Sequence, residues 1–146
     1  MSRVQLALNV SDLDAAIVFY SKLFATEPAK VRPGYANFAV ADPPLKLVLI
    51  EDAKGGTINH LGVEVESTAD VAAAKARLSD EGLATATEDQ VECCFALQDK
   101  VWVDDPDGAP WEFYTVLADV EMPAGELRNT DPADALCCGV EAPCCP

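Results

Sequence analysis

The chain has 146 residues and half of them are apolar, which is enough to bury the core of one ordinary domain or of two small fused modules. Ten basic residues against twenty-five acidic ones give a net charge of −15, which argues against binding to nucleic acids or to anionic membranes. No apolar run approaches the roughly 20 residues of a membrane helix, and the first residues lack the pattern of a secretory signal. We expect a soluble cytoplasmic protein.

The first half of the chain begins with an alternating segment at residues 5–10, which is typical of a half-buried strand. A helix is predicted next, because Ser11 or Asp12 can cap it and apolar residues then recur at helical spacing from Leu13 to Phe24. Further strands are predicted at 35–41 and 44–50, after a turn at Pro33-Gly34.

The second half repeats this order. Residues 60–65 resemble residues 5–10, and Ser67 or Thr68 can cap a helix whose C-terminal end is marked by Gly82. The polar stretch 85–90 is predicted to be a loop, and strands are predicted at 95–103 and 110–116. The sequence thus predicts an α+β fold of two paired βαβββ modules, at about 1–54 and 55–118, with a ligand cleft where they pack together.

The six cysteines form three adjacent pairs: Cys93–Cys94, Cys137–Cys138 and Cys144–Cys145. A disulfide between neighbours is strained, because their Cα atoms lie about 3.8 Å apart and disulfides prefer more than about 4.4 Å. We therefore expect reduced thiols, which suit a soft ion such as Cd(II), As(III) or Cu(I). Chance placement of small buried residues is the alternative.

The composition changes after Ala118. Residues 119–146 contain six acidic residues, one arginine and four of the six cysteines, without a sustained apolar period. We predict a flexible acidic tail whose cysteines, Cys137, Cys138, Cys144 and Cys145, are accessory ligands for a soft metal.

Three side chains on three predicted strands could together hold a divalent cation. His60, the single histidine, lies on the strand face opposite Leu61, and Gln5 holds the equivalent position in the first repeat. Glu112 is a carboxylate in an otherwise apolar stretch, where burial without a partner is costly. Such a set covers one face of the ion and leaves positions for water, O2 or substrate, as in non-haem Fe(II) oxygenases. A structural role for a lone histidine is equally compatible with the spacing.

Two lysines are not expected to take part in this site. Lys46 occupies the place in the first repeat that matches Glu112, and a charged lysine cannot bind a metal, so we expect no fourth protein ligand. For Lys100 the alternatives are contact with the substrate and a surface position, and we expect the surface position.

In these features the chain resembles the vicinal-oxygen-chelate superfamily of glyoxalases, bleomycin-resistance proteins and extradiol dioxygenases. Within it, the chain is most similar to the family of bacterial organoarsenical carbon–arsenic lyases and mycobacterial cadmium-induced proteins. The stretches that carry the resemblance are residues 1–10, 30–38, 43–49, 59–65, 93–96, 98–103 and 110–112.

The resemblance implies Fe(II) held by Gln5, His60 and Glu112 as the catalytic centre. It implies that Cys93 and Cys94 capture a trivalent organoarsenical such as methylarsenite, and that O2-dependent cleavage of its carbon–arsenic bond releases arsenite, giving resistance. Because adjacent strand residues point to opposite faces, two sulfurs that grip one atom require a loop, bend or bulge at Cys93–Cys94. We expect the loop predicted at 85–90, just before these cysteines, to load the substrate and close over the iron as a lid.

Three other functions remain open at this stage. The cysteine pairs and the acidic charge also fit a non-catalytic protein that sequesters cadmium or arsenite. A glyoxalase-type enzyme with Zn or Ni is weakened by the single histidine and by Lys46. A drug-binding module without metal fits a buried Glu112 poorly. The sequence also leaves open whether two copies pair as a homodimer.

Overall fold

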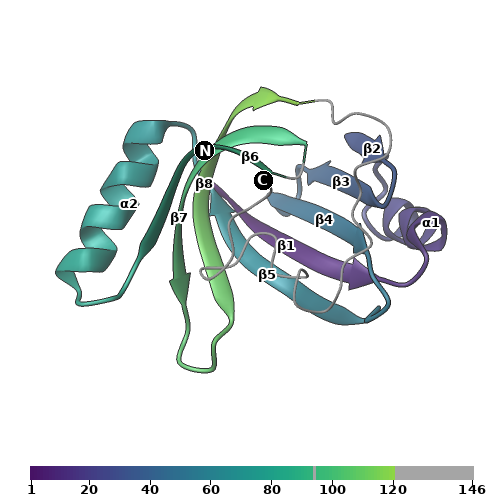
Figure 1. Ribbon diagram of the computed structural model, residues 1–146. Coiled ribbons are helices and arrows are strands. Elements are labelled where there is room, and N and C mark those ends of the chain that lie inside the picture. Colours follow the sequence, from purple (N-terminus) through teal and green to yellow (C-terminus); the bar gives the residue numbers. More distant parts are fainter. Residues whose placement is uncertain (94, 121–146) are drawn as a thin grey trace. The chain divides into compact units, whose positions relative to one another are not determined.

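The computed structural model describes residues 1–93 and 95–120. These residues form two compact units, a first unit of Arg3–Asn59 and a second unit of Met1–Ser2 together with His60 onward, and each is described by itself. The elements in chain order are β1 (Arg3–Val10), α1 (Leu13–Leu23), β2 (Lys30–Arg32), β3 (Tyr35–Val40), β4 (Leu45–Glu51), β5 (Thr57–Glu64), α2 (Thr68–Asp80), β6 (Ala86–Cys93), β7 (Ala96–Asp104) and β8 (Pro110–Asp119) (Figure 1). The predicted α+β fold with the order βαβββ, repeated once, is confirmed.

The first unit is a sheet with one helix on it. Its strand order is β2-β3-β4-β1, in which β1 and β4 are parallel and the other pairs antiparallel. Alternate residues of these strands, such as Phe38, Leu47 and Leu49, are buried in one apolar cluster with Leu13 of α1. The other face of the sheet carries buried polar side chains, among them Gln5. Burial of the apolar face, worth about 25 cal/mol per Å², holds the helix on the sheet.

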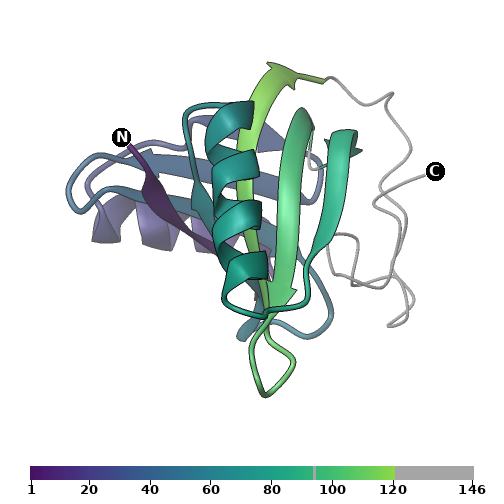
Figure 2. The same ribbon diagram turned by 90° about the vertical axis from the view of Figure 1, so that its left-hand side faces the viewer.

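The second unit has the same plan. Its strand order is β5-β8-β7-β6, with β5 and β8 parallel and the remaining pairs antiparallel. Helix α2 lies along one face of β7 and β8 (Figures 1 and 2) and buries Val71, Ala74 and Leu78. Helix α2 therefore covers one face of this sheet, and alternate residues of each strand point to the opposite face.

The predicted ends of both helices are confirmed. Asp12 caps α1, and its carboxylate accepts a hydrogen bond from the Ala15 backbone N–H at 2.9 Å. Ser67 caps α2 through the Asp70 N–H. Gly82 follows the last turn of α2 at φ +80°, a conformation that side chains with a Cβ rarely adopt. Local sequence signals thus set the ends of both helices.

The expectation of a loop at residues 85–90 is wrong. Residues 86–93 form β6, which pairs with β7 and ends this sheet as an edge strand. The stretch is polar because an edge strand exposes one face to water, and its alternation is interrupted by a bulge between Glu88 and Val91. The expectation of a lid-type loop at 85–90 is therefore not supported.

The predicted match of Lys46 with Glu112 is also wrong. In the first unit Lys46 pairs with Gln5 and Val48 pairs with Ala7. In the second unit Glu112 pairs with Gly62, which is the repeat partner of Ala7. Val48 is thus the counterpart of Glu112. The alignment that matches Lys46 with Glu112 is displaced by two residues.

No helix among the described residues is long and apolar enough to cross a membrane. The predicted tail begins at Asp119, which is the last residue of β8. The rest of that tail from residue 121, with its four cysteines, and Cys94 lie outside the described residues.

Candidate functional site

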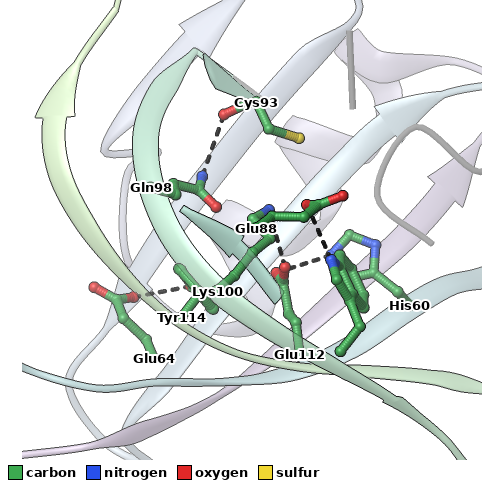
Figure 3. Close-up of polar contacts among 9 residues, drawn as sticks. His60, Glu64, Glu88, Cys93, Gln98, Lys100, Glu112 and Tyr114 are labelled. Atoms are coloured by element: carbon green, nitrogen blue, oxygen red, sulfur yellow. Dashed lines mark hydrogen bonds and ion pairs between the residues drawn. The ribbon is translucent and has the colours of Figure 1, made fainter. Parts of the chain in front are cut away.

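The face of the second unit's sheet that points away from α2 carries a group of buried polar side chains (Figure 3). His60 comes from β5 and Glu112 from β8, the strand that pairs with β5. His60 Nε2 lies 3.3 Å from Glu112 Oε1, and both side chains are at least 96% buried. The structure thus brings together two of the three predicted metal ligands.

Lys100 on β7 completes this group, and the expectation that it lies at the surface is wrong. Its side chain is 1% exposed, and Nζ lies 3.1 Å from Glu112 Oε2. Nζ also lies 5.3 Å from the centroid of the Trp102 ring, a cation–π distance. The two oxygens of Glu112 therefore have different neighbours, with Lys100 at Oε2 and His60 at Oε1.

The charge of Glu112 is fixed by these neighbours. Burial acts to raise the pKa of Glu112, but the electrostatic interactions and hydrogen bonds with Lys100 and His60 outweigh burial and lower the pKa from 4.5 to about 2. Glu112 is consequently an ionised carboxylate at neutral pH inside the protein, which is the protonation state that a metal ligand requires.

Trp102 connects this group to Cys93. The Trp102 ring meets the His60 imidazole edge to face, with centroids 5.6 Å apart. Trp102 is also buried in one cluster with Cys93, and its Nε1–H donates to Glu88 Oε2 at 3.1 Å. Cys93 and the His60–Glu112 pair therefore lie on the same face of one sheet, and Trp102 contacts His60 and packs in one cluster with Cys93.

Cys93 is the last residue of β6, where the chain turns into β7. Its backbone carbonyl accepts a hydrogen bond from Gln98 Nε2 at 3.2 Å, while Gln98 Oε1 is buried and has no hydrogen-bond partner within the described part of the chain. Phe95, which follows in the turn, has φ +64°. Cys93 therefore lies where a strand gives way to a turn. The expectation of reduced thiols differs from the structure, in which Cys93 is disulfide-bonded.

Gln5, the third predicted ligand, belongs to the first unit. It lies on β1, is 4% exposed and pairs in register with Lys46 of β4. A buried amide oxygen is a suitable ligand for a divalent cation. Within the residues described, no group of three His, Cys, Asp or Glu side chains could hold a metal ion.

The donor set of the second unit fits a divalent cation on chemical grounds. The facing atoms, an imidazole nitrogen and a carboxylate oxygen, are typical ligands of iron, manganese and zinc. Lys100 supports the ionised state of Glu112 and leaves Oε1 directed at the imidazole. The sequence analysis missed Lys100, although alternation along β7 places it on the same face as Trp102 and would have indicated it.

Over most of its length the chain is similar to two kinds of protein, cadmium-induced proteins and trivalent organoarsenical cleaving enzymes. It is 61% identical to the cadmium-induced protein CadI of Mycobacterium tuberculosis over 142 residues, which are 94% of this chain and 93% of that protein. It is 59% identical to the trivalent organoarsenical cleaving enzyme of Thermomonospora curvata over 140 residues, 94% of this chain and 89% of that protein.

Solved structures share the fold. An extradiol ring-cleaving dioxygenase from B. fuscum matches with a TM-score of 0.60 and 22% identity over 82% of this chain and 34% of that chain. A Mn(II)-bound glyoxalase from Novosphingobium aromaticivorans matches with a TM-score of 0.58 and 22% identity over 86% and 44%. The model of the Glyoxalase/Bleomycin resistance protein/Dioxygenase superfamily matches residues 3–113, and the chain belongs to that superfamily.

Proposed function

We propose that this protein is a lyase that cleaves the carbon–arsenic bond of trivalent organoarsenicals such as methylarsenite and releases arsenite, with Fe(II) as cofactor and O2 as co-reactant. The step balances with one O2 per methylarsenite, because one oxygen atom enters arsenite and the other leaves with the methyl carbon as formaldehyde. The observation that carries the proposal is that one sheet face holds both a buried imidazole–carboxylate pair and a cysteine, and that Trp102 packs with both of them. The 59% identity to a trivalent organoarsenical cleaving enzyme supports the same substrate class.

The His60–Glu112 pair and the cysteine on this face suit different chemical elements as ligands. Nitrogen and oxygen ligands at His60 and Glu112, completed by Gln5, suit iron, whereas a thiolate suits arsenic. Fe(II) bound there would supply the activation of O2. The thiols at Cys93 and Cys94 would hold the arsenical next to that centre, which is a contribution by proximity. This role requires the reduced form of Cys93.

Neighbouring side chains hold the His60–Glu112 pair and Cys93 in position. Lys100 holds Glu112 ionised and contacts its Oε2, so Oε1, which faces the His60 imidazole, is the oxygen that would bind the metal. Trp102 is fully buried and supplies an apolar surface beside the His60 imidazole and Cys93. Gln98 holds the carbonyl of Cys93. Each of these contacts lies within the second unit.

The test is a turnover assay on reduced protein loaded with Fe(II) under anaerobic conditions. We expect methylarsenite to be converted to arsenite after O2 is admitted, and to remain bound and unchanged without O2, as followed by arsenic speciation. Methylarsenite that stays intact in the presence of both Fe(II) and O2 would refute the proposed cleavage.

The second candidate function is sequestration of cadmium or arsenite without catalysis. It is favoured by the 61% identity to a cadmium-induced protein and by the three cysteine pairs. It predicts stoichiometric binding of Cd(II) or arsenite and no product in the turnover assay. The accessory role of Cys137, Cys138, Cys144 and Cys145 as soft-metal ligands is part of this candidate and would also be compatible with cleavage.

A further inference from the structure

The bulge in β6 determines which way Cys93 points. Residues directly opposite each other in an antiparallel pair lie on the same face of the sheet. Glu88 is opposite Lys100 and Val91 is opposite Gln98, so three steps on β6 match two steps on β7. Without the extra residue, the side chains on the face of Glu88 would be Gln90 and Glu92, and Cys93 would point to the α2 side.

With the bulge, both ends of β6 contribute to the face of the His60–Glu112 pair. Glu88 reaches Trp102 Nε1, and Cys93, opposite Ala96, packs with Trp102. The bulge requires an unusual backbone, because Gln90 has φ +51°, in the left-handed region that residues with a Cβ avoid. This conformation costs of order 1–3 kcal/mol and persists only where the surroundings hold it.

Asp99 is the side chain that holds the bulge. It lies on β7 between Gln98 and Lys100, points to the α2 side of the sheet and is 6% exposed. Its Oδ1 accepts the backbone N–H of Gln90 at 2.8 Å, and its Oδ2 accepts the hydroxyl of Thr68, the first residue of α2, at 2.6 Å. Hydrogen bonds to a carboxylate are about twice as strong as neutral ones, so Asp99 ties the bulge to the helix.

We propose that Asp99 is a positioning residue for substrate capture: by holding the Gln90 bulge it keeps the Cys93 side chain, whose sulfur binds the substrate once reduced, on the face of the His60–Glu112 pair. Asp99 contacts neither the thiol nor the proposed metal ligands, and it acts through the backbone of β6. The inference rests on the proposed function only in that the arsenical binds at Cys93. Asp99 would thus determine the affinity for thiophilic substrates although it lies on the α2 side of the sheet, opposite the face that carries the site.

The sharpest test uses a pair of variants at Gln90, whose own side chain is exposed. Gln90→Gly keeps the N–H and adopts φ +51° without strain, whereas Gln90→Pro removes the N–H and fixes φ near −65°. We expect Gln90→Pro to weaken binding of methylarsenite to reduced, metal-free protein at least tenfold, and Gln90→Gly to bind within about twofold of the wild type. Binding is followed through tryptophan emission, because Trp102 packs against Cys93.

Variants of Asp99 test the anchor itself. Asp99→Ala should weaken arsenical binding at least tenfold and leave Co(II) affinity, used as the metal probe, within twofold. Asp99→Asn keeps an acceptor for the Gln90 N–H and can donate to the Thr68 hydroxyl, so it should retain most of the affinity. Asp104→Ala, which removes an exposed carboxylate from the same strand, is the matched control.

The outcomes separate this inference from the proposed function. Folded Gln90→Pro and Asp99→Ala proteins that bind methylarsenite as tightly as the wild type would overturn the positioning role. Loss of Co(II) affinity in parallel with arsenical affinity would also overturn it, since it would indicate a general structural role. If Asp99→Ala does not fold, the Gln90 pair decides. Wild-type protein that binds methylarsenite but never cleaves it would refute the proposed lyase and leave this inference intact.

Discussion

The two units repeat one architecture but differ in the chemistry of the sheet face that points away from the helix. In the first unit this face carries neutral buried side chains, Gln5, Asn9 and Asn37. In the second unit it carries the ionisable residues His60, Lys100 and Glu112, and both His60 and Lys100 contact Glu112. The repeated hydrophobic pattern therefore sets the fold of both units, and the identities of a few polar residues give only one of them a charged cluster.

The backbones of the two units differ as well. The pairs β1–β4 and β3–β4 run in unbroken register, whereas β6–β7 and β7–β8 each contain a register shift. Bulges redirect side chains and are common next to functional sites. The unit with the charged cluster is thus also the unit with the irregular strands.

The largest expected effect comes from removing the imidazole. His60→Ala should abolish metal binding and lower cleavage by more than about 100-fold, because one of two facing ligands is lost. Metal content and arsenic speciation measure this. The matched change in the first unit is Asn9→Ala, which removes a buried amide that donates to Thr57 and should leave the metal content unchanged. A metal-replete, active His60→Ala protein would place the centre elsewhere.

Replacing the thiol separates capture from metal binding. Cys93→Ser, and equally Cys94→Ser, should abolish cleavage while the protein keeps its iron, because a hydroxyl does not replace a thiolate as a ligand of arsenic. Iron content and turnover are measured on the same preparation. Unchanged turnover in either variant would show that the arsenical is held by other groups.

Lys100→Met should strongly destabilise the metal-free protein. Removing one partner of a buried ion pair costs about 3–5 kcal/mol, since it leaves an uncompensated charge. Added Co(II) should recover part of the loss by taking over the role of the cation at Glu112. Lys46→Met in the first unit, where the lysine is only partly buried, should cost less. Urea unfolding with and without Co(II) gives both values, and an equal loss in the two variants would contradict the distinction drawn between the units.

Acid should reveal the charge of Glu112. Its pKa in the folded protein, about 2, lies below the ordinary value of 4.5, so its contribution to stability is complete above pH 4.5 and is lost as the pH falls towards 2. The contribution amounts to roughly 3 kcal/mol. The difference in unfolding free energy between metal-free wild type and Glu112→Gln should therefore shrink across that range, and a difference independent of pH would be inconsistent with an ionised Glu112.

The smallest effect on cleavage is expected from truncation. Deletion of residues 121–146 leaves β8 intact and should change the rate of cleavage less than twofold, while lowering the number of Cd(II) ions bound. Loss of all cleavage would make the tail part of the site.

Much of the fold could be predicted from the sequence, because capping residues and hydrophobic periods act locally. Asp12 and Ser67 begin the two helices as expected, and the strand that carries Glu112 begins at residue 110 as predicted. The bulge at Gln90 could not be predicted, because the anchor that stabilises it, Asp99, is nine residues away and acts only after β7 has paired.

The site was predicted in part for a similar reason. His60 and Glu112 stand out by residue type within apolar strands, and the structure brings them together. Alternation along β7 places Lys100 on the face of Trp102, but its burial depends on the ion pair with Glu112 of the neighbouring strand. The interpretation of Lys100 as a surface residue failed because lysine is seldom buried unless it is paired.

The central claim is that His60 and Glu112 bind the metal while Cys93 binds the arsenical next to it. The most direct test of this claim is to follow the metal while the thiol binds arsenic. Reduced protein is loaded with Co(II) in place of iron, and its visible absorption bands are recorded anaerobically before and after methylarsenite is added. We predict that the bands shift in the wild type and do not change in Cys93→Ser, because the arsenical reaches the His60–Glu112 pair only when Cys93 holds it. Bands that stay the same in the wild type at saturating methylarsenite would contradict a shared site.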